Sequence, residues 1–277
     1  MKTITLTNPT DNQALSGLAF DAPVKPKAVI ALVHGFGEHG GRYEPMAAAL
    51  KEKDIAVVSV DLHGHGHTEG KRGVSHTYNA LMSDVNAIID KTKSLYPDVP
   101  LFLFGHSMGG GLVLNNVLRR RPEGLAGVIS SAPLIKPADP FPGFQRFMLR
   151  VMRKLMPNFT ANAGLDSAGI STIQAEVDKY NNDPLVHGKM GAGLAIDVMA
   201  GGEWLLEYAN VWYETVPLLL YHSKEDTLTD FSASEEFGRL APGCEFYAYE
   251  NVGHEMHNDT SREDVFKMID NFISRHI

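Results

Sequence analysis

Short, uninterrupted apolar runs recur along this chain. They are rich in Val, Ile and Leu and lie at residues 28–33, 55–60, 101–104 and 216–221. Strands buried on both faces have this pattern, whereas a strand with one wet face alternates apolar and polar residues. Two further strand-like segments lie at residues 128–131 and 245–250. The pattern therefore predicts a mostly parallel sheet that is covered on both sides.

Segments with helical periodicity separate these runs. In residues 43–53, Met46, Ala49 and Leu50 share one stripe, and residues 78–95 carry a longer apolar stripe of the same period. Alternation of strands and helices is typical of α/β proteins, in which right-handed crossovers place helices on both faces of the sheet. We therefore expect an open α/β sheet flanked by helices.

The alternation is interrupted once. After residues 128–131 and Pro133, the next clear strand begins at Val216, and a gap of this length far exceeds an ordinary crossover connection. Open α/β sheets bind ligands at the carboxyl ends of their strands. We predict that residues 134–212 form a cap inserted over that edge, and that residues 1–133 and 213–277 form the core.

Composition narrows the class of protein. The 277 residues carry a net charge of −8 and a pI of about 5.8, so nucleic acid would be repelled on average. The single cysteine, Cys244, excludes an internal disulfide. Residues 1–14 lack the apolar core of a secretory signal, and no apolar stretch reaches the roughly 18 residues that span a bilayer. We expect a cytoplasmic protein with no nucleic-acid partner.

The strongest chemical signal is a G-x-S-x-G motif at residues 105–109, with Ser107 at its centre. It follows the strand predicted at residues 101–104 and precedes a plausible helix at residues 110–121. This strand–turn–helix setting is that of a nucleophile elbow, whose tight turn requires small residues on either side of the serine. The motif and its context indicate that Ser107 is a nucleophile.

A serine hydroxyl needs a base to remove its proton and an acid to orient that base. In proteins with a nucleophile elbow, the acid and then the histidine follow the serine in the chain. Asp226 follows the strand predicted at residues 216–221, with Glu225 and Asp230 as competitors; Asp230 suits a helix N-cap better. His254 follows the next strand in a loop, whereas His257 lies nearer the final helix. We predict Asp226 as the acid and His254 as the base.

A tetrahedral intermediate also needs backbone N–H donors that stabilise its oxyanion. One donor is expected from Met108, the residue after the nucleophile. The other is expected from the glycine-rich loop at residues 34–37, which follows the strand at residues 28–33. Glycines allow that backbone to approach a substrate closely, and we predict the Phe36 N–H as the second donor.

Four segments together resemble the monoacylglycerol lipase family. Residues 34–43 (HGFGEHGGRY) are similar to that family's HGxGEHSGRY signature, and residues 105–110 to its GHSMGG elbow. Residues 61–70 resemble its DxxGHGxSxG loop, with Thr68 in place of serine, and residues 180–186 its Y-N-x-D-P-L segment. The same motifs occur in the wider family of lysophospholipases and serine aminopeptidase-like hydrolases.

The resemblance implies an α/β-hydrolase fold, with a mostly parallel eight-stranded sheet flanked by helices and an inserted cap. It implies hydrolysis of a monoglyceride into fatty acid and glycerol through an acyl-enzyme, without a cofactor. It also places Glu38, Arg42 and Tyr180 against the glycerol. Two alternatives stay open: a lysophospholipase or broad short- to medium-chain carboxylesterase, and a structural ion pair between Glu38 and Arg42 at the start of a helix.

Two further patterns bear on ligands. His63, His65 and His67 alternate as in some zinc loops, but no carboxylate or cysteine cluster completes a metal site, so no metal is expected. Residues 144–156 have an apolar stripe opposed by a basic stripe of Arg146, Arg150 and Arg153. This helix either covers the acyl tunnel from within or touches a membrane surface transiently. The second reading would make the protein peripheral at a membrane.

Overall fold

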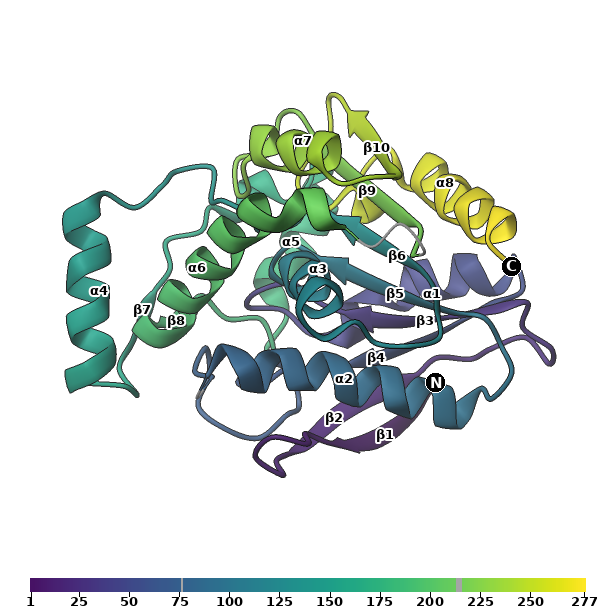
Figure 1. Cartoon of the computed structure of the whole chain (residues 1–277), viewed down its shortest axis with the longest axis horizontal. Coiled ribbons are helices and arrows are strands. Elements are labelled where there is room, and N and C mark those ends of the chain that lie inside the picture. The colour runs from purple at the N-terminus through teal and green to yellow at the C-terminus, as the bar shows by residue number, and fades with distance from the viewer. Residues whose placement is uncertain (76, 213–215) are drawn as a thin grey trace.

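The central strands of the sheet are buried on both faces, as their apolar runs predict. The computed structural model describes residues 1–75, 77–212 and 216–277. Its main sheet has eight strands in the order β1-β2-β4-β3-β5-β6-β9-β10 (Figure 1). The strands are β1 (Lys2–Thr7), β2 (Ala14–Ala19), β3 (Ala28–Val33), β4 (Ile55–Val60), β5 (Leu101–His106), β6 (Leu125–Ser131), β9 (Leu218–Ser223) and β10 (Cys244–Tyr249).

Six neighbouring strands, from β4 to β10, are parallel, and β1 and β2 add an antiparallel edge. The predicted mostly parallel sheet is therefore confirmed. β9 begins two residues later than predicted, after Pro217, whose nitrogen has no hydrogen to donate to a ladder. The β1–β2 hairpin is not apparent from apolar runs, because on β1 the buried Ile4 and Leu6 alternate with exposed residues.

Helices cover both faces of the sheet. On one face, α1 (Glu44–Lys51) and α8 (Arg262–Arg275) contribute side chains such as Leu50 and Ile269 to a buried apolar cluster that includes Ile30. On the other, α2 (Tyr78–Leu95) and α3 (Met108–Arg120) contact β3 and β5, and α7 (Phe231–Leu240) contacts β9 and β10. This arrangement leaves the carboxyl ends of the parallel strands free to carry functional loops.

The long segment between β6 and β9 contains several elements of its own. They are α4 (Gly143–Leu155), β7 (Thr160–Asn162), η2 (Ser167–Gly169), α5 (Gln174–Asn182), β8 (Lys189–Gly191), α6 (Ala192–Tyr208) and η3 (Ala209–Val211). β7 and β8 pair antiparallel, and α6 contacts both α4 and the core helices α3 and α7. Figure 1 shows α4 at the margin of the molecule, separated from the main sheet by α6. In the described ranges, no helix is long and apolar enough to cross a membrane.

Candidate active site

Ser107 lies in the sharp turn between β5 and α3. Its backbone angles, φ 54° and ψ −119°, fall in a region that residues with a Cβ rarely occupy. A Cβ on Gly105 would overlap the backbone of Gly109, and one on Gly109 would overlap the carbonyl oxygens of Val33 and His34. The turn is therefore tight enough to need glycine at both positions, as the motif predicts.

Asp226 and His254 meet at the carboxyl ends of the paired strands β9 and β10. The Oδ2 atom of Asp226 lies 2.5 Å from Nδ1 of His254. The other carboxylate oxygen accepts hydrogen bonds from the backbone N–H groups of Leu228 and Thr229, at 2.7 and 3.0 Å. Both side chains are buried, and the pair that the sequence predicts is brought together.

The competing residues have other partners. Asp230 caps α7 by accepting from the backbone N–H groups of Ser232 and Ala233, as predicted. Glu225 accepts a hydrogen bond from the backbone N–H of Asn251 at 2.9 Å. The imidazole of His257 stacks on Tyr43, with ring centroids 5.0 Å apart.

Sequence reasoning missed two side chains that hold Asp226. His222, on β9, lies with Nε2 2.8 Å from Asp226 Oδ2, and the Thr229 hydroxyl donates to the same oxygen at 2.9 Å. His222 also contacts the hydroxyl of Ser234 through Nδ1, at 2.8 Å. The sequence shows that His222 and Asp226 are four residues apart. A histidine inside a buried strand, however, does not by itself indicate that it contacts the acid.

Burial and charge set the proton affinity of the pair. Burial disfavours the charged form of His254, but the Asp226 carboxylate outweighs it and raises the pKa of the imidazole above its usual value. Burial also opposes ionisation of Asp226, but His254 and His222 hold the pKa of that carboxyl well below its usual range. The carboxylate is thus ionised, as a partner that orients an imidazole must be.

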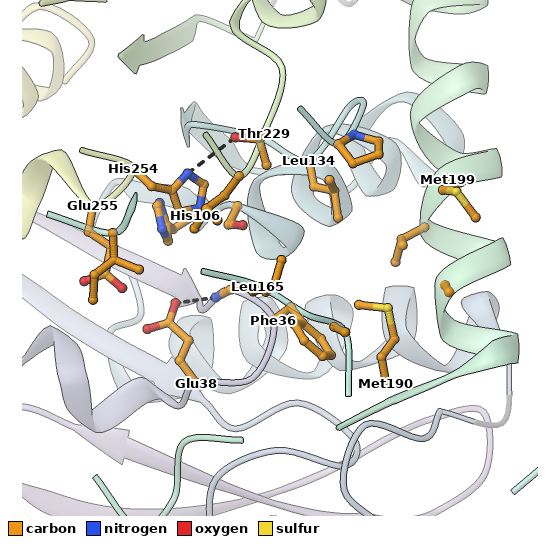
Figure 2. Close-up of a pocket in the computed structure, with 18 of the residues that line it drawn as sticks. Phe36, Glu38, His106, Leu134, Leu165, Met190, Met199, Thr229, His254 and Glu255 are labelled. Carbon is orange, nitrogen blue, oxygen red and sulfur yellow. Dashed lines mark hydrogen bonds between the residues drawn. The ribbon is translucent and has the colours of Figure 1, made fainter. Parts of the chain in front are cut away.

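A cavity joins these residues to the segment between β6 and β9. Its wall includes Ser107, His254, Gly35 and Phe36. Figure 2 shows His254, Glu38 and Glu255 at one end, and Met190 and Met199 at the other. The apolar part of the wall consists mainly of Leu134, Phe141, Leu165, Ile170, Met190, Val198, Met199 and Leu228. The cavity is therefore polar beside the imidazole and apolar beyond the serine.

Of the two expected oxyanion donors, Met108 directly follows Ser107 in the chain and Phe36 lines the same cavity. Met108 is the first residue of α3, where backbone N–H groups have no partner within the helix. Phe36 lies on the cavity wall, and its ring packs edge-on against His65 and His187. His34 steadies the same loop, since its Nδ1 lies 2.7 Å from the carbonyl oxygen of Gly35.

Glu38 and Arg42 form the ion pair that was left open as an alternative, with Arg42 Nη1 2.6 Å from Glu38 Oε2. Arg42 also donates to both carboxylate oxygens of Glu255, at 2.6 and 2.8 Å, which the sequence did not suggest. Glu38, Tyr180 and Glu255 line the cavity, and the Arg42 guanidinium lies behind them, 4.7 Å from the centroid of the Tyr180 ring.

The alternating histidines of residues 63–67 point to different partners. His63 contacts Asp84 at 2.8 Å and Asp11 at 3.0 Å. His65 is buried with its Nδ1 2.8 Å from the carbonyl oxygen of His63, and His67 is exposed. Among the residues that the structure describes, no three His, Cys, Asp or Glu side chains are grouped to hold a metal ion.

The fold and the elbow define the chain as a hydrolase of the α/β-hydrolase fold. Residues 24–261 match the family model described as serine aminopeptidase, S33, and the chain belongs to this family. It is 34% identical over 260 residues to the human monoglyceride lipase, covering 90% of this chain and 83% of that protein. The resemblance seen in the motifs is confirmed, and the protein is a carboxylic-ester hydrolase.

Two further comparisons agree. The crystal structure of the Paleococcus ferrophilus monoacylglycerol lipase superposes with a TM-score of 0.84 at 27% identity, covering 95% of this chain and 99% of that one. An uncharacterized abhydrolase domain-containing protein of Dictyostelium discoideum is 34% identical over 271 residues. The match covers 97% of this chain but spans only 28% of the length of that protein.

Proposed function

We propose that this protein hydrolyses monoglycerides to a fatty acid and glycerol, through an acyl-enzyme on Ser107. The observation that carries the proposal is the single cavity that joins Ser107 and His254 to an apolar chamber on one side and to a small polar end on the other. An ester with one acyl chain and a small polyol fits such a division, whereas a triglyceride has two further chains to accommodate.

In this proposal His254 removes the proton of Ser107 as the hydroxyl attacks the ester carbonyl, and Asp226 stabilises the imidazolium that forms. The N–H groups of Phe36 and Met108 stabilise the oxyanion. His254 then protonates the departing glycerol oxygen. Water repeats the sequence on the acyl-enzyme and releases the fatty acid. Each step uses groups of this chain, and the chemistry requires no cofactor.

The proposed glycerol end is formed by Glu38, Arg42 and Tyr180. Carboxylate oxygens on the cavity wall accept hydrogen bonds from hydroxyl groups, and Arg42 would act from behind by fixing Glu38 and the Tyr180 ring. Two buried carboxylates face one guanidinium here, so the net charge is negative. A phosphate headgroup would be repelled, and this argues against the lysophospholipase alternative.

We propose that residues 134–212 act as the cap. They supply Leu165, Tyr180 and Met190 to the cavity wall, and α6 adds Val198 and Met199. The second half of this segment is attached to the core: the His187 N–H donates to the carbonyl of Gly37 at 2.8 Å. α6 also packs on the core helices α3 and α7. Its carboxyl-terminal part would therefore belong to the cap and to the core at once.

We also propose that α4 touches a lipid surface while substrate is loaded. Its apolar stripe faces outward: the residues Phe144 and Leu155 are 74% and 73% exposed, and Phe147 and Met148 are exposed as well. The stripe therefore does not cover the tunnel from within, which was the other reading of its pattern. Such a face favours insertion at the acyl boundary of a membrane.

Two of the three arginines in the basic stripe of α4 form ion pairs within the protein. Arg146 pairs with Glu203, and Arg153 pairs with Asp197, both on α6, so these two arginines hold the helix to the body of the protein. Arg150 and Lys154 are exposed and would contact anionic headgroups. In this account the apolar face supplies most of the affinity for lipid.

The experiment that tests the proposed function is a panel of initial rates. Monoglycerides of graded chain length are compared with a triglyceride, a lysophosphatidylcholine and p-nitrophenyl esters of the same acyl chains. We expect the highest kcat/KM on a monoglyceride. A higher kcat/KM on lysophosphatidylcholine would assign the protein to the lysophospholipases instead.

A further inference from the structure

The two loops that the proposed chemistry requires come from opposite ends of the chain. Residues 34–38 follow β3 and carry the expected oxyanion donor, and residues 251–257 follow β10 and carry His254. Glu38 belongs to the first loop and Glu255 to the second, and the Arg42 guanidinium bridges their carboxylates (Figure 2 shows the two glutamates beside His254). A geometric tie thus connects the base to the oxyanion loop.

Each member of this tie is buried and well bonded. The side chains of Glu38 and Glu255 are 3% exposed, and that of Arg42 is 10% exposed. Glu38 Oε1 accepts from the backbone N–H of Gly35 at 2.6 Å and from the Tyr43 hydroxyl at 2.8 Å. The two Nη atoms of Arg42 donate to the two carboxylate oxygens of Glu255. Bidentate, buried pairs of this kind fix geometry strongly, because removing one partner strands a charge.

We infer that Glu255 is a positioning residue, which acts through Arg42 to hold the His254 loop in register with the oxyanion loop. The inference rests on the proposed function, since it assumes that His254 and Phe36 act on the same substrate. It differs from a role in glycerol binding, because misplacing the base and the oxyanion donor slows the chemistry of every ester.

The charge of Glu255 has a second consequence. The groups that face His254 are the carboxylates of Asp226, Glu255 and Glu38, the imidazoles of His106 and His257, and the Arg42 guanidinium. Burial lowers the pKa of His254, because it disfavours the charged imidazolium. The carboxylates of Asp226, Glu255 and Glu38 act in the opposite direction, and the pKa is raised overall. Loss of the charge on Glu255 should therefore make His254 less basic.

The test compares Glu255→Gln with Arg42→Met, and uses Glu250→Gln as the matched control. Glu250 pairs with Lys224 on the surface, outside the proposed site. We expect Glu255→Gln to lower kcat about 10- to 100-fold on both a monoglyceride and p-nitrophenyl butyrate, as small misplacements of reacting groups do. For Glu255→Gln, KM should stay within about twofold on both substrates, because Glu255 is not among the three residues proposed to form the glycerol end.

The pH profile separates positioning from general damage. For Glu255→Gln, the midpoint of the acid limb of kcat/KM should fall by about half a pH unit or more. Arg42→Met also lowers kcat, but it removes positive charge, so its midpoint should stay in place or rise. Glu250→Gln should match the wild type in both respects. Arg42→Lys keeps the positive charge but loses the bidentate geometry of the guanidinium, so its kcat should lie between those of the wild type and Arg42→Met.

A folded Glu255→Gln variant with wild-type kcat would overturn the inference, as would midpoints that fall equally in Glu255→Gln and Arg42→Met. If Glu255→Gln does not fold, Arg42→Lys and Arg42→Met decide: unchanged kcat in both would refute the tie. Failure of the proposed function looks different. In that case the wild type itself would not hydrolyse a monoglyceride, although the soluble ester could still report the effect of the tie.

Discussion

The Nδ1 atom of His254 lies 2.5 Å from Oδ2 of Asp226, while Oδ1 of the same carboxylate is occupied by two backbone N–H groups. The carboxylate therefore cannot rotate, and it specifies the tautomer with a hydrogen on Nδ1. The other ring nitrogen, Nε2, is left as the base for a serine.

Asp226→Asn should consequently lower kcat by several orders of magnitude, about 10⁴-fold in comparable hydrolases, because the amide favours the wrong tautomer. The matched control is Asp230→Asn, which alters a helix cap and should keep its activity, with a stability cost below about 1 kcal/mol. Steady-state kinetics and thermal unfolding of both variants are the measurements. If the Asp230 variant lost turnover and the Asp226 variant kept it, the acid would be misassigned.

The raised pKa of His254 predicts the pH profile of the enzyme. The base must be neutral to accept a proton, so kcat/KM should rise with pH through the pKa of His254. Because Asp226 raises that pKa, the midpoint should lie above that of an ordinary imidazole, about 6.5. The pH dependence of kcat/KM on a soluble ester measures it. A midpoint well below that value would contradict the electrostatics described for the site.

Tyr180→Phe tests the glycerol end. Tyr180 lines the cavity; in the variant its ring stays under the Arg42 guanidinium and only the hydroxyl is lost. One hydrogen bond to substrate is worth about 0.5–1.5 kcal/mol, so KM for a monoglyceride should rise roughly 2- to 12-fold. KM for a p-nitrophenyl ester of the same acyl chain should change less. Equal changes would mean that Tyr180 supports the structure without contacting glycerol.

The outward face of α4 predicts how the protein meets insoluble substrate. Replacing Phe144, Phe147 and Leu155 together by Ser should weaken co-sedimentation with neutral and anionic vesicles, and leave hydrolysis of p-nitrophenyl butyrate unchanged.

Replacing Arg150 and Lys154 by Gln provides the electrostatic arm of this test. It should weaken binding to anionic vesicles alone, most visibly at low salt. Undiminished vesicle binding by the triple Ser variant would leave α4 as a lid without a lipid contact.

Buried parallel strands were readable from the sequence because burial on both faces leaves a continuous apolar run, as in residues 28–33. Ser107 and Asp226 were predicted because each follows such a strand at its carboxyl end, and His254 because it follows β10, a strand that is only partly buried. The orientation of α4 was not. The sequence shows an apolar and a basic stripe but not which of them faces the protein. In the structure Arg146 and Arg153 pair with α6, and the apolar stripe faces outward.

Glu255 was missed for another reason. Its partner Arg42 lies 213 residues away, so no local pattern connects them. Sequence spacing finds groups that share a loop or a helix, whereas an ion pair between two loops depends on how the whole sheet brings strand ends together. The same limit applies to the contact of His187 with Gly37, which attaches the proposed cap to the oxyanion loop.

The central claim is that Ser107 carries the acyl group. The protein is reacted with a fluorophosphonate and digested, and mass spectrometry of the peptides then locates the modified residue directly. We predict a single adduct on the peptide that contains Ser107, formed in parallel with loss of monoglyceride hydrolysis, and neither labelling nor turnover in a folded Ser107→Ala variant. An adduct on another residue, or a labelled and active Ser107→Ala variant, would contradict the account.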